Sequence, residues 1–127
     1  MDLTQCTATE LMELYRGGDA SPVEALQQVL DRVERLDPVL NAFVFVDAES
    51  GMAAARASEV RWAAHRADGS PVGDLDGVPT TIKDILWTKG WPTLRGSRSV
   101  NPDQPWNDDA PSVARLREAG AVMFGKT

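Results

Sequence analysis

Apolar residues recur at intervals of three and four along residues 22–36, which is the period of a helix that buries one face. The stripe consists of Val23, Leu26, Leu30 and Val33. Ser21 and Pro22 predict the start of this helix, since serine caps an N-terminus and proline suits the first helical position. Asp37-Pro38 predicts its end, because a residue that precedes proline disfavours the helical conformation.

Two further helices and a strand complete the first half of the pattern. A helix capped by Thr9 is expected to be stopped by Gly17-Gly18, and an alanine-rich helix is expected over residues 48–66. Between the two long helices, residues 42–46 are aromatic and β-branched, which predicts a short buried strand. Residues 1–70 are therefore expected to be mainly helical.

The second half of the chain is rich in glycine and proline, with fewer regular elements. Residues 78–83 alternate between apolar and polar, which predicts a strand with Lys83 on its polar face. Residues 111–119 predict a helix that Gly120 ends, and residues 121–124 predict another strand. Helices that separate strands favour an α/β fold with some parallel pairing. Because the sheet would be narrow, its apolar strands are expected to need neighbours from elsewhere.

Composition narrows the class of protein. The chain has 127 residues, of which 43% are hydrophobic and 25% charged, as in a globular domain. A net charge of −6 argues against a nucleic-acid partner, because phosphate binding uses clustered Lys and Arg. A single cysteine, Cys6, cannot form an internal disulfide, and no signal peptide or membrane-spanning run is recognisable. A cytoplasmic protein without membrane contact is expected.

The segment from Gly120 to Thr127 satisfies the letter pattern of a phosphate-binding P-loop. A P-loop needs a strand before its first glycine, a flexible phosphate-wrapping loop, and a helix after the Lys-Thr pair. Here a helix is predicted before Gly120, and residues 121–124 have the composition of a strand. Nucleotide binding through Lys126 is therefore a minor alternative, and no cofactor or metal is expected.

Lys83 is the residue of the alternating segment that carries candidate chemistry. A charged lysine between apolar neighbours is costly to bury, whereas a neutral lysine accepts a proton near neutral pH. A single lysine on a strand is nevertheless more often exposed or ion-paired. Local chemistry alone therefore favours an exposed or ion-paired lysine over a catalytic base.

Three ordered segments resemble the amidase signature family. Residues 75–84, Leu-Asp-Gly-Val-Pro-Thr-Thr-Ile-Lys-Asp, resemble the segment that carries the family's lysine. Residues 90–97 resemble its Thr-x-x-Gly-Ser stretch, and residues 109–127 resemble the element that ends in Gly-Lys-Thr. A looser likeness at residues 21–24 and 40–43 extends the resemblance over essentially the whole chain.

The resemblance implies a hydrolase of carboxamides, built on a mixed β-sheet flanked by helices. It also implies a Ser–cis-Ser–Lys triad, in which Lys83 relays a proton through the middle serine to activate the nucleophilic serine. The family's serines lie beyond its Gly-Lys-Thr element, so residues 1–127 are expected to form the N-terminal, incomplete part of such a domain, with the lysine-bearing strand, loop and helix–strand region in residues 71–127. The expected partners are a small amide substrate and either a C-terminal polypeptide or a second copy.

Two expectations follow for this chain by itself. Ser97 and Ser99 lack the Gly-x-Ser-x-Gly elbow of a nucleophile, and a turn is the expected role of Ser97. The chain alone is therefore expected to hydrolyse nothing. The alternative is a small non-catalytic α/β module that binds a partner.

Overall fold

The computed structural model describes residues 1–127 as helices packed around one small sheet. After a 3-10 turn at Leu3–Gln5, the helices are α1 (Ala8–Gly17), α2 (Pro22–Leu40), α3 (Ala48–Asp68) and α4 (Pro111–Glu118). The strands are β1 (Phe45–Val46), β2 (Pro79–Ile82) and β3 (Val122–Lys126). β3 is central, antiparallel to β1 and parallel to β2. The predicted mixed sheet flanked by helices is confirmed.

The first two helices begin at capping boxes. The hydroxyls of Thr7 and Ser21 each accept the backbone N–H three residues on, and the carboxylates of Glu10 and Glu24 accept the N–H of the cap in return. Each box pairs backbone donors that a helix start leaves free. The box places the start of α1 at Ala8, so the predicted cap at Thr9 was two residues late.

The predicted end of α2 at Asp37-Pro38 was wrong. The helix continues through Pro38 to Leu40, and Asn41 ends it in the left-handed conformation with φ of 50°. The Asp37 carboxylate accepts the N–H groups of Ala42 and Phe43, at 2.7 and 3.1 Å. A side chain therefore supports the chain beyond the proline, and this support offsets the helix-breaking preference of the proline.

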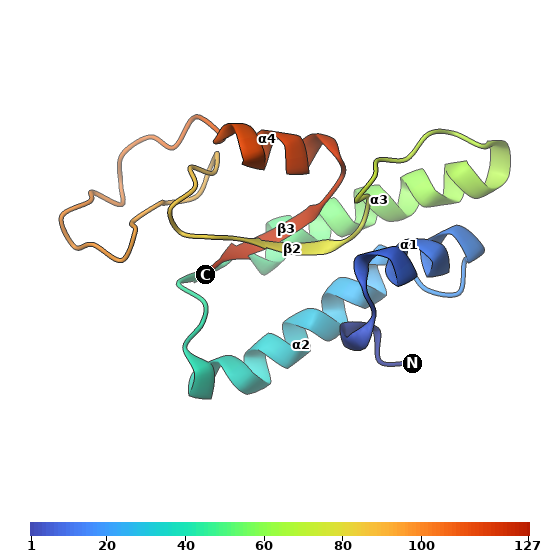
Figure 1. Ribbon diagram of the computed structural model, residues 1–127, viewed down its shortest axis with the longest axis horizontal. Coiled ribbons are helices and arrows are strands. Elements are labelled where there is room, and N and C mark those ends of the chain that lie inside the picture. The colour runs from blue at the N-terminus through green and yellow to red at the C-terminus, as the bar shows by residue number, and fades with distance from the viewer.

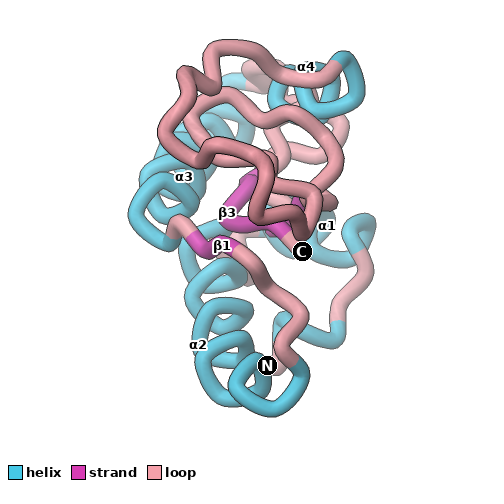
Figure 2. The backbone as a smooth tube through the Cα atoms, turned by 90° about the vertical axis from the view of Figure 1, so that its left-hand side faces the viewer, coloured by secondary structure: helices cyan, strands magenta, loops and turns pink.

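The predicted buried strand over residues 42–46 was largely wrong as well. Only Phe45 and Val46 pair with β3, and Val44 and Val46 remain 62% and 41% exposed. β1 is an edge strand that pairs on one side only, so its outer edge has no neighbouring strand. Figure 2 shows this short strand beside β3, with α2 extending away beneath it.

Side chains of β3 alternate between two apolar clusters, one on each face of the sheet. The cluster against α2 and α3 consists of Leu26, Ala55, Val122 and Phe124. The cluster against α4 and the loop before it consists of Ile82, Trp91, Val113 and Met123. Figure 1 accordingly shows the strands between α4 above and α2 below. The sheet is therefore covered on both faces.

The remaining elements differ from the predictions only at their ends. α3 runs two residues past residue 66, and β3 runs to Lys126 instead of residue 124. β2 ends at Ile82, so Lys83 lies immediately after the strand. None of the helices combines the length and apolar character that a bilayer-spanning segment requires.

Candidate functional site

Lys83 projects from a backbone that is fixed on both sides. Its side chain is exposed, whereas the neighbouring Ile82 and Asp84 are only 2% and 6% exposed. The Asp84 N–H donates to the carbonyl of Thr127 at 2.9 Å, and the Thr127 N–H donates to the carbonyl of Ile82 at 3.1 Å. The Leu86 N–H donates to the carbonyl of Lys83 itself, at 3.0 Å. This chain therefore orders the backbone of Lys83 but leaves its amine uncovered.

A second lysine, Lys126, is buried beside this backbone. It has no exposed surface, and its Nζ donates to the carbonyls of Leu86 and Pro92, at 3.0 and 3.3 Å, and to the hydroxyl of Thr93. Its Nζ also lies 3.5 Å from the Asp84 carboxylate. Burial lowers the pKa of Lys126, and the Asp84 carboxylate opposes this effect. From the sequence, Lys126 was considered as a P-loop lysine and as part of the family's Gly-Lys-Thr element, but this cluster was not predicted.

The segment from Gly120 to Thr127 does not have the geometry of a P-loop. Gly120 ends α4 with φ of 83°, as predicted, and residues 122–126 form the central strand. The N–H groups of Val122 and Thr127 donate to the carbonyls of Val78 and Ile82. These N–H groups are therefore bonded to β2 and to the residue before it. The segment is a strand, whereas a P-loop requires a loop whose N–H groups are free to bind phosphate.

The buried side chain of Asp76 fixes the residues that lead into β2. Its carboxylate accepts two hydrogen bonds from Arg61, at 2.6 and 2.8 Å, and one from the hydroxyl of Ser58. The Asp76 carbonyl accepts the indole N–H of Trp62 at 3.0 Å. The hydrogen bond to Asp76 raises the pKa of Arg61. One turn of α3 thus fixes the start of the lysine-bearing strand, and no local signal in the sequence joined these residues.

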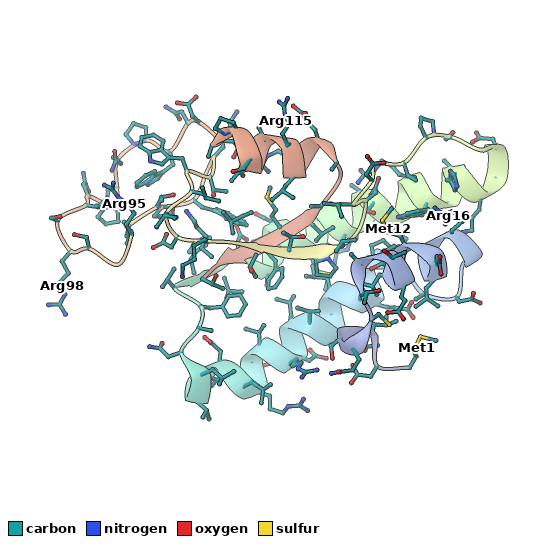
Figure 3. The ribbon with its side chains drawn as sticks, viewed as in Figure 1. Met1, Met12, Arg16, Arg95, Arg98 and Arg115 are labelled. Carbon is teal, nitrogen blue, oxygen red and sulfur yellow. The ribbon has the colours of Figure 1, made fainter.

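Ser97 and Ser99 form a turn in the loop between β2 and α4. The Ser97 N–H donates to the carbonyl of Leu94 at 2.9 Å, and the two hydroxyl oxygens lie 2.7 Å apart. In Figure 3 Arg98, between them in sequence, points outward from the tip of this loop. The hydrogen bonds agree with the predicted turn role of Ser97, and neither serine is hydrogen-bonded to Lys83.

A cavity of about 440 Å³ lies between α3 and α4, and a groove of about 560 Å³ runs beside the end of α2. Two of the three cationic residues of the cavity are already paired, Arg61 with Asp76 and Arg117 with Asp109. No three His, Cys, Asp or Glu side chains lie together as a metal site would require. Lys83 lines neither hollow, so the candidate for chemistry lies apart from both.

Comparison with known proteins identifies relatives of this arrangement. The family model described as Amidase matches residues 24–127. The chain is 46% identical over 126 residues to a glutamyl-tRNA(Gln) amidotransferase subunit from Salinispora arenicola, covering 99% of the chain and 25% of that protein. The chain therefore spans about a quarter of the length of that relative.

Solved structures give the same result. A peptide amidase from Stenotrophomonas maltophilia superposes with a TM-score of 0.82 and 29% identity, over 97% of this chain and 24% of that one. A bacterial aryl acylamidase of the amidase signature family superposes with a TM-score of 0.80 and 30% identity, over 96% and 25% of the two chains. The arrangement of helices and strands described above is thus that of one quarter of these enzymes.

Proposed function

Because the chain belongs to the amidase family, we propose that it contributes the catalytic lysine, Lys83, to an enzyme that hydrolyses the C–N bond of a carboxamide. The observation that carries the proposal is the position of Lys83, exposed at the end of β2 on a backbone that buried neighbours hold in place. A second stretch of polypeptide can reach this amine. In the proposal that stretch supplies the two serines of a Ser–cis-Ser–Lys triad.

The proposed reaction has two stages. Neutral Lys83 takes a proton from the middle serine, which takes one from the nucleophilic serine as the latter attacks the amide carbon. The C–N bond then breaks, and the leaving ammonia or amine takes up the proton that Lys83 gained, through the middle serine, so that Lys83 is neutral again. Water next attacks the acyl-serine and releases the acid. Polypeptide that covers Lys83 would remove water from the amine, which favours the neutral form that this step needs.

The relatives define the substrate class that we propose. They include a peptide amidase, an aryl acylamidase and one component of an amidotransferase, whose names share amide chemistry but not one acyl group. The proposed substrate is accordingly a carboxamide, and the proposed partner is the serine-bearing polypeptide. A cytoplasmic location is proposed because the lone Cys6 does not require an oxidising compartment.

A non-catalytic interaction module is the second candidate function. It is favoured by apolar side chains that stay uncovered where α2 ends and β1 begins, namely Val39, Leu40 and Val44, which are 86%, 66% and 62% exposed. This candidate predicts a stable chain that binds a partner, with no role for Lys83 in turnover.

The deciding experiment is substitution of Lys83 by methionine in a complete enzyme that carries both this sequence and the serines. Ammonia release from a panel of primary amides is expected to fall about 10²- to 10⁴-fold, the usual contribution of a positioned base. Lys89→Met is the matched control, because Lys89 is also exposed and lies six residues further along. The 127-residue chain alone is expected to release no ammonia.

Two results would overturn the proposal. One is a K83M enzyme that keeps the rate of the K89M enzyme. The other is ammonia release by the isolated chain that disappears on substitution of Lys83, because the serines of another polypeptide would then be unnecessary.

A further inference from the structure

The buried Lys126 is the one ionisable group of the central strand, and the proposed reaction does not use it. All of its partners belong to the segment that directly follows Lys83. They are the carboxylate of Asp84, the carbonyls of Leu86 and Pro92, and the hydroxyl of Thr93. A cation at the end of the central strand therefore holds the irregular segment that follows the candidate base.

We propose that Lys126 is a positioning residue for Lys83. Its ammonium ties residues 84–93 to β3 and so fixes the backbone from which the Lys83 side chain projects. The catalytic consequence rests on the proposed function of Lys83, whereas the structural consequence does not. This role also explains why a Gly-Lys-Thr sequence occurs here in a strand instead of a phosphate loop.

The chemistry of the cluster requires a cation. An ammonium has three donors, and three oxygen acceptors from residues 86, 92 and 93 converge on it. A neutral side chain of the same length would take the ammonium donor away from the carbonyl of Pro92, leave the carbonyl of Leu86 with threonine hydroxyls alone, and leave Asp84 without its countercharge. Buried acceptors and carboxylates without partners are costly, so the segment would move to find water.

The contacts of Lys126 affect both ends of the segment from Asp84 to Leu94. The Asp84 carboxylate that faces Lys126 also accepts the N–H of Leu94, at 3.3 Å. The Asp84 N–H bonds the carbonyl of Thr127, next to Lys126 in sequence. Residues 84 and 94 are thus drawn together onto the end of β3. Loss of the cation is expected to loosen the whole loop, beginning at the residue after Lys83.

Amide hydrogen exchange in the full chain tests the structural part. In Lys126→Met, the amides of Asp84 and Leu86 are expected to exchange about tenfold faster or more, the factor that follows from losing a charge-assisted hydrogen bond. Amides within α3 are expected to change much less. An equal acceleration of all these amides would overturn the inference, because it would show a general loss of stability instead of local positioning.

A pair of buried threonines supplies the matched control. Thr88 and Thr93 are 1% and 2% exposed, and both hydroxyls donate to the carbonyl of Leu86, but only Thr93 contacts Lys126. Thr93→Val is therefore expected to reproduce the faster exchange at Asp84, and Thr88→Val is expected to leave it close to that of the unsubstituted chain. The opposite order would overturn the inference.

Kinetics of a complete enzyme that carries this sequence test the catalytic part. Lys126→Met is expected to lower kcat about tenfold with KM nearly unchanged, and to shift the pH dependence of kcat, because the displaced base is Lys83. If K83M is inactive while K126M keeps the full kcat and the same pH profile, Lys126 does not position the base. If K83M is fully active, the proposed function fails, and the exchange result still decides whether Lys126 holds the backbone.

Discussion

Substitution of Asp76 by asparagine is expected to destabilise the chain by about 2 kcal/mol, far more than a surface ion pair contributes. Asp76 is acceptor-only and receives hydrogen bonds from Ser58 and from two nitrogens of Arg61. Asparagine has nearly the same size but replaces one oxygen with an NH₂ group, which cannot accept. At least one donor therefore loses its partner, and the approach to β2 loses part of its link to α3.

The magnitude follows from burial. Loss of a hydrogen bond between charged groups costs about 1.5–3 kcal/mol when the groups are desolvated. The Asp76 side chain is 2% exposed, but that of Arg61 is 43% exposed. Because the guanidinium can turn toward water, the cost is expected in the lower half of that range. Asp109→Asn is the control, since the same bidentate pair with Arg117 lies nearer the surface, at 13% and 49% exposure.

Urea unfolding followed by tryptophan fluorescence measures the difference, since Trp62 packs directly beside this cluster. With a typical slope for a domain of this size, D76N is expected to lower the midpoint by about 1 M. D109N is expected to lower it by less than half as much, because exposed pairs contribute about 1 kcal/mol or less. Equal shifts for the two variants would refute the assignment of Asp76 as the main link between α3 and β2.

Two other predictions concern a pair of glycines and the ion pair of Asp109. Gly120 and Gly69 both have positive φ, 83° and 78°, but a Cβ at Gly120 would lie 2.9 Å from the Cα of Asp76, whereas nothing lies within 4 Å at Gly69. Gly69→Ala should therefore lower the unfolding free energy by about 1 kcal/mol, through backbone strain alone. Gly120→Ala should lower it by about 3 kcal/mol, because a steric clash adds to the backbone strain. Equal shifts in melting temperature for the two variants would contradict this. The Arg117 guanidinium holds the pKa of Asp109 below its ordinary 3.8, so the pair stabilises the chain above that pH and the benefit disappears as pH falls through the lowered value. The urea midpoints of the unsubstituted chain and D109N should accordingly differ at about pH 6, and the difference should shrink as the pH falls below 3.8. A difference that does not change with pH would exclude this ion pair as the cause.

Much of the fold could be predicted from hydrophobic periodicity and from the residues that begin and end helices. The stripe of α2, the alanine-rich α3 and the glycine after α4 are local signals, and each element formed where its signal lies. The errors have a shared physical origin. α2 continues past Pro38 because the Asp37 carboxylate bonds backbone N–H groups beyond the helix end, and Val44 is exposed because β1 lies at the edge of the sheet. Both effects depend on neighbours that a local sequence pattern does not contain.

The candidate site was also predicted only in part, for the same reason. The resemblance pointed to Lys83, and alternation in residues 78–83 placed it at the end of a strand. The groups that hold that strand, Asp76 and Lys126, were not identified, because their partners come from other elements of the fold. The only sequence signal was a lysine at the end of an otherwise apolar strand, and its resemblance to a nucleotide-binding motif obscured it.

The strand order has a consequence for how the chain acquires its structure during synthesis. β1 and β2 do not pair with each other, and each finds its only partner in β3, which is made after both. While the ribosome is still translating the residues before Val122, the two earlier strands are unpaired, and the side chains of α2 and α3 that pack against Val122 and Phe124 lack the cover that β3 gives them. Pairing of β1 and β2 must therefore wait for β3, and the apolar surface that β3 covers is open to a chaperone until that strand emerges.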